Sequence, residues 1–195
     1  MRIGIVSDLH RNIAGLNKAL DRMGEVDKIL CAGDAFDQFC FSNHVIERLQ
    51  KIGAEYILGN HEEALLSPAG ARAAESQQVD KELLEWTRSR DYRFEMAIDD
   101  KRLKMFHSTP WDPRGEYIYP HSGALKKFAE ADTQFTIYGH THTQLARDIN
   151  GTLVINPGSA GHARSHVNGR QLSFAILDTE TDQVVFDDFS DPSKP

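Results

Sequence analysis

Short apolar runs recur along the chain, and in the first half they alternate with segments of helical periodicity. After the first run, residues 3–6, an apolar stripe at helical spacing predicts a helix that begins after Asn12, which is suited to cap a helix N-terminus. A second stripe begins near Ser42 and ends before Gly53, a residue suited to the position after a helix C-terminus. The first half therefore predicts a β-α-β-α arrangement.

Strand patterns dominate the second half of the chain. The segment Glu62–Asp91 lacks a strand signal, and its end, Val79–Ser89, is expected to be helical. Seven strand candidates follow, with one predicted helix around Ala124–Ala131 between them. The candidates are Phe94–Ile98, Leu103–Phe106, Phe135–Tyr138, Leu145–Ile149, Leu153–Ile155, Leu172–Leu177 and Val184–Phe189.

Three pairs of these strands are expected to form hairpins. The turn residues between them are Asp99-Asp100, Asn150-Gly151 and Thr179–Asp182, and Asn-Gly is the strongest turn signal of the three. A βαβα first half and a strand-rich second half predict an α/β (α+β) fold, a two-sheet β-sandwich flanked by helices. At 195 residues and 40% hydrophobic, with no linker or repeat, the chain is expected to form a single domain, residues 1–195.

The charge of the chain limits its partners. The formal net charge of −7 argues against broad nucleic-acid binding, which requires a basic face. The chain begins directly with a strand and holds no apolar run as long as a membrane span, so we expect a soluble cytoplasmic protein without a membrane partner. Cys31 and Cys40 do not have the Cys-x-x-Cys spacing. The sequence is compatible with either a monomer or an oligomer.

Five polar signals stand directly after apolar runs of the predicted strands. They are Asp8-x-His10, Gly33-Asp34, Gly59-Asn60-His61, His107 and Gly139-His140-Thr141-His142. Ligands of α/β sheets bind at the carboxyl ends of the strands, so we expect these side chains to converge on one edge. Carboxylate, amide and imidazole groups are ligands of transition metals such as Zn, Mn, Fe, Co and Ni. The pattern predicts a metal site.

These motifs, in this order and over nearly the whole chain, resemble those of the calcineurin-like metallophosphoesterases. Asn156-Pro157-Gly158-Ser159 resembles the terminal signature of the family's small prokaryotic phosphodiesterases. The resemblance implies the family's two-sheet sandwich and two divalent metal ions, with Mn favoured and Fe, Zn, Ni, Co or Mg as alternatives. It implies that Asp8, His10, Asp34 and His142 hold the first ion, and that Asp34, Asn60, His107 and His140 hold the second.

The resemblance also implies catalytic roles. His61 matches the family's catalytic histidine, and Asp37 matches the acidic residue that supports it. Two ions about 3.5–4 Å apart can share a hydroxide that attacks phosphorus in line. His61 is not needed as a ligand and is then free to donate a proton, or at least a hydrogen bond, to the leaving alkoxide. The alternative interpretation of Asp37 is an ordinary carboxylate in a turn.

Departures from the family bear on the substrate. Phosphoprotein phosphatases and diadenosine tetraphosphate hydrolases have an arginine where this chain has Gln38, which favours a small phosphodiester or nucleotide-like substrate. The alternative activities are those of a phosphomonoesterase or a nucleotide phosphatase. Arg11 stands where small prokaryotic members usually have glycine. The candidate substrate contacts are Arg11, Asn12, His162 and Arg164. For His162 and Arg164 the other interpretation is that they lie in a solvated loop.

Two further expectations concern the segment after His61 and the class of protein. Residues 62–91 are expected to form a helical insertion that covers the site, and Glu62 and Glu63 would disfavour additional negative charge there.

The retromer complex contains a metallophosphoesterase-fold subunit that serves as a binding platform, so a non-catalytic scaffold is the other class of protein. Such scaffolds can dispense with ligands or with the catalytic histidine. This chain has the full set, which favours an enzyme.

Overall fold

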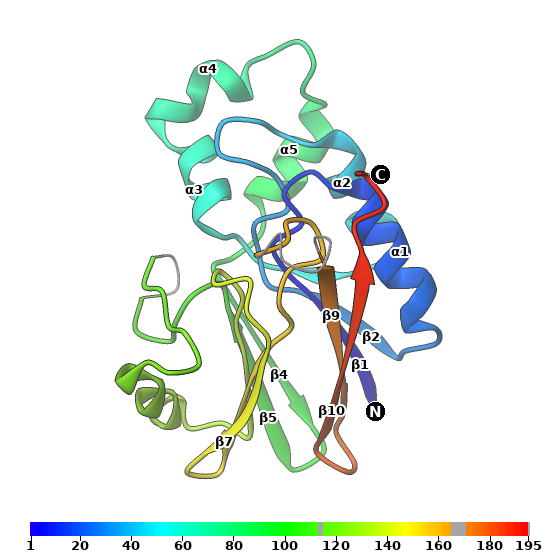
Figure 1. The fold of residues 1–195 in the computed structure, drawn as a ribbon. Coiled ribbons are helices and arrows are strands. Elements are labelled where there is room, and N and C mark those ends of the chain that lie inside the picture. The colour runs from blue at the N-terminus through cyan, green and yellow to red at the C-terminus, as the bar shows by residue number, and fades with distance from the viewer. Residues whose placement is uncertain (113–114, 165–170, 195) are drawn as a thin grey trace.

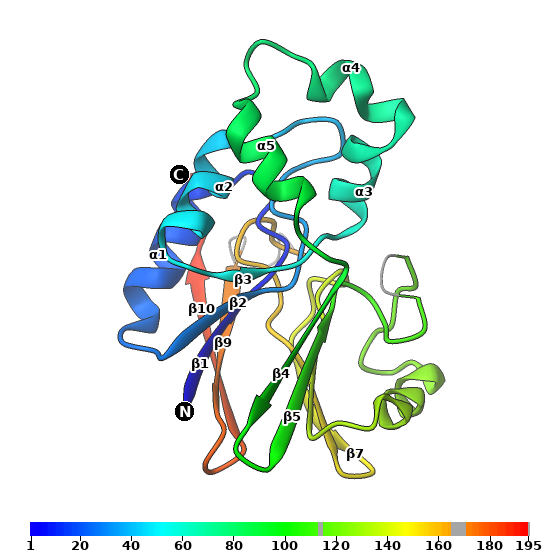
Figure 2. The ribbon, with the colours of Figure 1, turned by 180° about the vertical axis from the view of Figure 1, so that it is seen from behind.

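A computed structural model describes residues 1–112, 115–164 and 171–194, and it contains two five-stranded sheets (Figures 1 and 2). The strands of the first sheet, in spatial order, are β10 (Gln183–Ser190), β9 (Gln171–Asp178), β1 (Arg2–Val6), β2 (Lys28–Cys31) and β3 (Glu55–Tyr56). Those of the second are β4 (Arg93–Ile98), β5 (Lys101–Phe106), β6 (Phe135–Ile137), β8 (Thr152–Asn156) and β7 (Leu145–Ile149).

Each sheet is mixed, with three neighbouring parallel strands, and β1 of the first sheet also pairs antiparallel with β9. In the first sheet β1, β2 and β3 run parallel, and in the second β5, β6 and β8 do so. The three predicted hairpins are confirmed as the pairs β4–β5, β7–β8 and β9–β10. At the β7–β8 turn Asn150 and Gly151 both adopt positive φ, 53° and 88°, as a tight Asn-Gly hairpin requires.

The helices lie outside the pair of sheets. They are α1 (Ile13–Met23), α2 (Asn43–Lys51), α3 (Asn60–Leu66), α4 (Ala71–Ala74) and α5 (Lys81–Arg88), with 3₁₀ segments at Pro68–Gly70 and Gly123–Ala131. Asn12 caps α1 as predicted, because its side chain accepts a hydrogen bond from the amide of Gly15 at 2.8 Å. Figure 1 shows α3, α4 and α5 above the sandwich, at the end where β1 and β2 stop.

The helix predicted around residues 124–131 is a 3₁₀ helix. Its buried residues Leu125, Phe128 and Ala131 are three positions apart, which matches the three residues per turn of a 3₁₀ helix. The segment ends at Asp132, which adopts the left-handed conformation.

The described residues form three apolar clusters, and the two larger ones border the first sheet. One lies between the sheets and joins residues such as Ile5 and Leu30 of the first sheet to Met105 and Ile137 of the second. The other lies under α1 and α2, so the first sheet is buried on both faces. Burial on both faces fixes its central strands firmly, and with them the loops at their carboxyl ends. The predicted two-sheet sandwich with flanking helices is confirmed.

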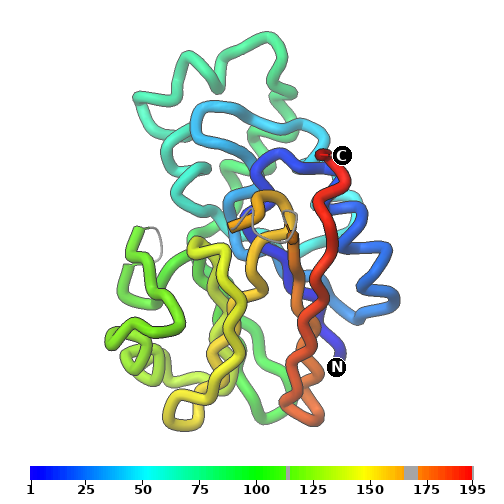
Figure 3. Tube along the Cα trace, in the orientation of Figure 1, coloured from blue at the N-terminus to red at the C-terminus, as the bar shows by residue number. Residues whose placement is uncertain are grey.

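The loops at these strand ends meet at one place in the molecule. In Figure 3 the chain segments that follow β1, β2 and β8 pass close to one another near the centre of the trace. Backbone hydrogen bonds join them: Ala160 donates to Ser7 at 3.0 Å, and Arg11 donates to Ala35 at 3.0 Å. Within the described residues, none of the helices is long and apolar enough to cross a membrane.

Candidate metal centre

The residues predicted as metal ligands stand where the backbone turns sharply at the ends of strands. Five of them adopt a positive φ, which is uncommon for a residue with a side chain. The angles are 54° for Asp8, 43° for His10, 54° for Asp34, 65° for His140 and 52° for His142. Such strained backbone persists only where surrounding contacts hold it, and it concentrates at functional sites. The strain therefore marks this edge as a candidate site.

Hydrogen bonds tie these loops to one another. The carboxylate of Asp8 accepts from the amide of His140 at 3.0 Å, and that of Asp34 accepts from the amide of His61 at 3.0 Å. The amide of Asp8 in turn donates to the carbonyl oxygen of Gly33 at 3.0 Å. Each buried carboxylate thus holds a second loop in place, and its remaining lone pairs stay available to a cation.

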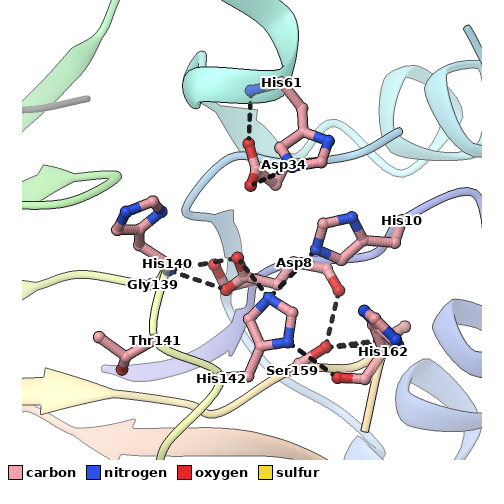
Figure 4. Close-up of polar contacts among 12 residues, drawn as sticks. Asp8, His10, Asp34, His61, Gly139, His140, Thr141, His142, Ser159 and His162 are labelled. Carbon is pink, nitrogen blue, oxygen red and sulfur yellow. Dashed lines mark hydrogen bonds and ion pairs between the residues drawn. The ribbon is translucent and has the colours of Figure 1, made fainter. Parts of the chain in front are cut away.

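The terminal signature has a structural part in the centre. The buried side chain of Asn156 donates to the carbonyl oxygen of Gly139 at 2.7 Å and to the hydroxyl of Thr141 at 3.1 Å. The hydroxyl of Ser159 donates to the carbonyl oxygen of Asp8 at 2.8 Å (Figure 4). These bonds connect the loop that carries the last two histidines to the loop after β1.

The side chains expected to hold the first ion, here called the first group, converge between the loop after β1 and the loop after β6. Nε2 of His10 lies 3.1 Å from Nε2 of His142, and Oδ1 of Asp8 lies 3.3 Å from the same His142 nitrogen. A carboxylate oxygen of Asp34 lies within 4.8 Å of ligand atoms of Asp8 and His10. The structure therefore brings together the four residues expected to hold the first ion.

The second group forms around His107. Its Nε2 lies 2.9 Å from Oδ1 of Asn60, 3.1 Å from Nδ1 of His140 and 3.2 Å from Oδ2 of Asp34. These are the four residues expected to hold the second ion. Asp34 belongs to both groups, as a bridging ligand would.

The second nitrogen of each of these four imidazoles faces an oxygen acceptor. The contacts are His10 Nδ1 to Asp37 Oδ1 at 3.1 Å, His107 Nδ1 to the carbonyl oxygen of Ala32 at 2.7 Å, His142 Nδ1 to that of His162 at 3.0 Å, and His140 Nε2 to that of Gly115 at 3.3 Å. The acceptor fixes a proton on the nitrogen that it faces, so the neutral ring turns its lone pair toward the cluster. Metal-bound histidines have this arrangement.

This donor set fits divalent metal ions. If both imidazoles of a group were neutral, they would direct lone pairs at each other across 3.1 Å, which is repulsive unless a cation binds there. Carboxylate, amide and imidazole donors are those that Mn, Fe, Zn, Co and Ni accept. A proton on one of the two facing nitrogens would also relieve this repulsion.

The charges at the centre favour such a proton on His107. Burial opposes charge on both partners, but the mutual attraction of Asp34 and His107 outweighs it. It holds the pKa of Asp34 well below its usual range and raises the pKa of His107 to about 10. Burial, with His107 next in effect, lowers the pKa of His140 to about 4. In the metal-free protein these shifts favour a charged His107 and a neutral His140.

His61 lies at the start of α3, beside both groups. Its ring centroid is 4.8 Å from that of His10, and its Nε2 is 3.8 Å from Oδ2 of Asp34. Its Nδ1 accepts a hydrogen bond from the backbone amide of Gln38 at 2.6 Å. The neutral ring must therefore carry its proton on Nε2, the nitrogen that faces Asp34. Burial is the main cause that lowers the pKa of His61, which favours this neutral form.

Asp37 lies beside both His10 and His61, and ligand atoms of the three side chains are within 4.8 Å of one another. Within the described residues, Oδ1 of Asp37 takes the 3.1 Å contact from His10, and Oδ2 accepts from Arg11 at 3.3 Å. The loop after β2 also gives His61 the amide of Gln38. Asp37 therefore orients a candidate ligand, and its support of His61 stays a prediction. The sequence could not separate these partners because both histidines lie far from Asp37 along the chain.

Glu62 has a structural role that the sequence reasoning missed. Its side chain is fully buried. It accepts hydrogen bonds from the amides of Asp34, Ala35 and Gly59 and from the hydroxyl of Tyr56. Burial, followed by the charge of Asp34, raises its pKa to about 7. The available signal was its place as N3 of a helix, from which a glutamate reaches back to the N-cap amide.

Three of the four candidate substrate contacts line one cavity. Arg11, Asn12 and His162, together with Lys194, border a cavity of about 400 Å³ that opens beside His10. The fourth, Arg164, borders a different cavity, together with His142. The first of these cavities therefore adjoins the first group of candidate ligands through His10.

The side-chain amide of Asn12 is already used within the protein. Besides capping α1, it donates to the carbonyl oxygen of Gly161 at 3.0 Å and to Oδ1 of Asp191 at 2.9 Å. Asn12 thus has a structural role, since it ties the C-terminal segment to the start of α1, and substrate contact by its side chain stays a prediction.

Comparisons with known proteins agree with this geometry. Phosphodiesterase MJ0936 of Methanocaldococcus jannaschii is 28% identical over 187 residues, which cover 92% of this chain and 94% of that protein. The crystal structure of a metallophosphoesterase from Sphaerobacter thermophilus is 26% identical, with a TM-score of 0.76, and the match covers 97% of this chain and 89% of that one. Vps29 from Entamoeba histolytica, 19% identical with a TM-score of 0.57 and coverage of 97% and 100%, shares the fold.

A family model also matches most of the chain. Residues 1–182 match the calcineurin-like phosphoesterase superfamily domain, and this range contains all of the predicted metal ligands as well as His61. The chain therefore belongs to the calcineurin-like phosphoesterase superfamily.

Proposed function

We propose that the protein is a phosphodiesterase that requires two divalent metal ions and hydrolyses a small or nucleotide-like phosphodiester. The observation that carries the proposal is the pair of imidazole clusters that share Asp34, with the ring of His61 beside them. When bound, two divalent ions activate a water molecule and hold the oxygens of the phosphate ester during an in-line displacement.

The ligands divide between two sites. Asp8, His10, Asp34 and His142 would hold one ion, and Asp34, Asn60, His107 and His140 would hold the other. Asp37 supports the first site, since it holds Nδ1 of His10 and turns Nε2 of that ring toward the cluster. The carbonyl oxygen of Ala32 does the same for His107 in the second site.

His61 would act on the leaving oxygen as a hydrogen-bond donor. Its proton is on Nε2 because Nδ1 accepts from the amide of Gln38. A charged imidazolium would place a second N–H against that amide, so the contact disfavours it. Donation of a hydrogen bond from the neutral ring needs no such charge, and it stabilises negative charge as it develops on the leaving oxygen.

Preference for a diester over a monoester rests on two observations. One curated relative that matches almost the whole chain is named a phosphodiesterase. Gln38 also stands where the phosphatases named above have a phosphate-gripping arginine, and its backbone amide is engaged with His61. A monoester would bring an additional negative charge that nothing at this position neutralises.

Hydrolysis of paired model substrates tests the proposal. Chelator-treated protein receives Mn²⁺, Ni²⁺, Co²⁺, Zn²⁺ or Mg²⁺ singly, and turnover of bis(p-nitrophenyl) phosphate is compared with that of p-nitrophenyl phosphate. We expect metal-restored activity that prefers the diester, its loss in Asp34→Asn, and its retention in Asp21→Asn, which alters an exposed aspartate of α1. A monoester preference would make the protein a phosphatase, and inactivity of folded protein with two bound ions would favour a scaffold.

A further inference from the structure

An aromatic surface borders the candidate metal centre on the side of His140. The ring of Tyr117 is stacked on the imidazole of His140, with 3.8 Å between the centroids and 29° between the planes. Tyr117 is nevertheless 56% exposed, so the stack leaves much of its ring open to solvent. The ring of Tyr119 lies 6.2 Å from that of Tyr117, with 21° between the planes. The guanidinium of Arg164 lies 4.9 Å from the centroid of Tyr119.

The segment that carries both tyrosines is firmly anchored. Ile118, between them, is buried in an apolar cluster with Phe128 and Tyr138. Its carbonyl oxygen accepts a hydrogen bond from the hydroxyl of Tyr138 at 3.0 Å. The exposed ring of Tyr117 and the partly buried ring of Tyr119 therefore stand on either side of an anchored position. A platform that is held in advance loses little conformational entropy when a ligand binds.

The position of Tyr117 places its ring next to the expected chemistry. Burial and then the negative charge of Asp34 raise the pKa of Tyr117, which agrees with its closeness to the buried carboxylates. A phosphate held by the two imidazole clusters would have Tyr117 at its edge, because the tyrosine covers His140. A flat substituent attached to that phosphate could lie on the exposed part of the ring.

We propose that Tyr117 and Tyr119 form a stacking platform for an aromatic ring, a nucleobase or an aryl group, attached to the phosphate of the substrate. The inference rests on the proposed function, since it names the class of substituent that the ester carries. Stacking on an aromatic side chain suits any base or aryl ring, because each has a π face. The platform therefore selects aromatic over small aliphatic esters.

Affinity for two esters of equal charge tests the platform without requiring turnover. Calorimetry on Mn²⁺-loaded protein would compare methyl phenyl phosphate with dimethyl phosphate, two diesters of equal charge that differ in one substituent. We expect tighter binding of methyl phenyl phosphate to the wild type. Tyr117→Leu should weaken its binding about tenfold and leave that of dimethyl phosphate unchanged. Tyr117→Phe, which keeps the ring, should behave as the wild type does.

Equal affinity of the wild type for the two esters, equal weakening of both by Tyr117→Leu, or no measurable binding of methyl phenyl phosphate would overturn the platform. Thermal unfolding of each variant verifies that it is folded, which the exposure of Tyr117 favours. The hydrolysis assay on the same preparations separates the two proposals. Turnover of the diester without ring-dependent affinity refutes the platform alone, and ring-dependent affinity without turnover refutes the phosphodiesterase alone.

Discussion

At the scale of single residues, the contacts around His61 define its role more narrowly than its place in a motif can. The amide of Gln38 occupies one ring nitrogen and leaves Nε2 as the donor toward the site. A neutral donor helps most when the leaving oxygen is strongly basic, because that oxygen gains most from a hydrogen bond. Its contribution should therefore depend on the leaving group.

His61→Ala should retain its metal content and lose roughly 10²–10⁴-fold in turnover of an alkyl diester. The loss should be smaller with p-nitrophenolate, which leaves without help. Kinetics on both substrates, with metal analysis of the same samples, check this. His44→Ala, which alters an exposed histidine of α2, should change nothing. Loss of metal from His61→Ala would contradict the role.

The ion pair of Asp34 and His107 predicts a pH dependence of metal binding. Asp34 raises the pKa of His107 to about 10, so the metal-free protein carries a proton there at pH 7. A metal ligand must be deprotonated, so binding releases this proton and affinity should rise with pH until about 10. Calorimetry at pH 7 in buffers of different ionisation enthalpy should detect the released proton. Binding without proton release would show that His107 is neutral beforehand.

At the scale of elements, the strand-to-loop turns are the parts that sequence patterns predicted well. Apolar runs identified β1, β5 and β6 because these strands are buried, and the polar residue after each run marked the strand end. Asn12 and Gly53 marked helix ends through local backbone rules. The partners of Asp37 and Glu62 could not be predicted in this way, because they come from loops that only the tertiary fold brings together.

Close packing of these turns predicts the effect of a single methyl group. A Cβ at Gly139 would overlap the hydroxyl of Ser7 and lie 2.8 Å from Oδ2 of Asp8. Gly139→Ala should therefore displace Asp8, lower the melting temperature and weaken metal binding about tenfold or more. Gly123→Ala is the matched control, since nothing lies within 4 Å of its Cβ. An unchanged metal affinity in Gly139→Ala would refute the tight turn.

Glu62 at the start of α3 connects this helix to the loop after β2. Its carboxylate accepts from the amides of Asp34, Ala35 and Gly59, and an amide side chain cannot replace both oxygens. Glu62→Gln should lower the free energy of unfolding by about 1–3 kcal/mol, because a buried donor loses its acceptor. Denaturant unfolding measures this. Glu47→Gln, which removes only the exposed pair with Lys51, should cost much less; equal losses would contradict the role.

At the scale of the whole molecule, the two sheets bring distant parts of the sequence to one edge. Asp8 comes from the first sheet, while His107 follows β5 and His140 and His142 follow β6 of the second. Sequence order and strand ends predicted this convergence because the family motifs span the chain. The aromatic platform on residues 117–119 was not predicted, since its meaning depends on the contact of Tyr117 with His140.

Anomalous diffraction from crystals of the Mn²⁺-loaded protein would locate the bound ions. We expect two manganese peaks that share Asp34, one between His10 and His142 and the other between His107 and His140. A single peak in the shared cluster, or manganese bound elsewhere with this cluster empty at saturating metal, would contradict the two-metal centre.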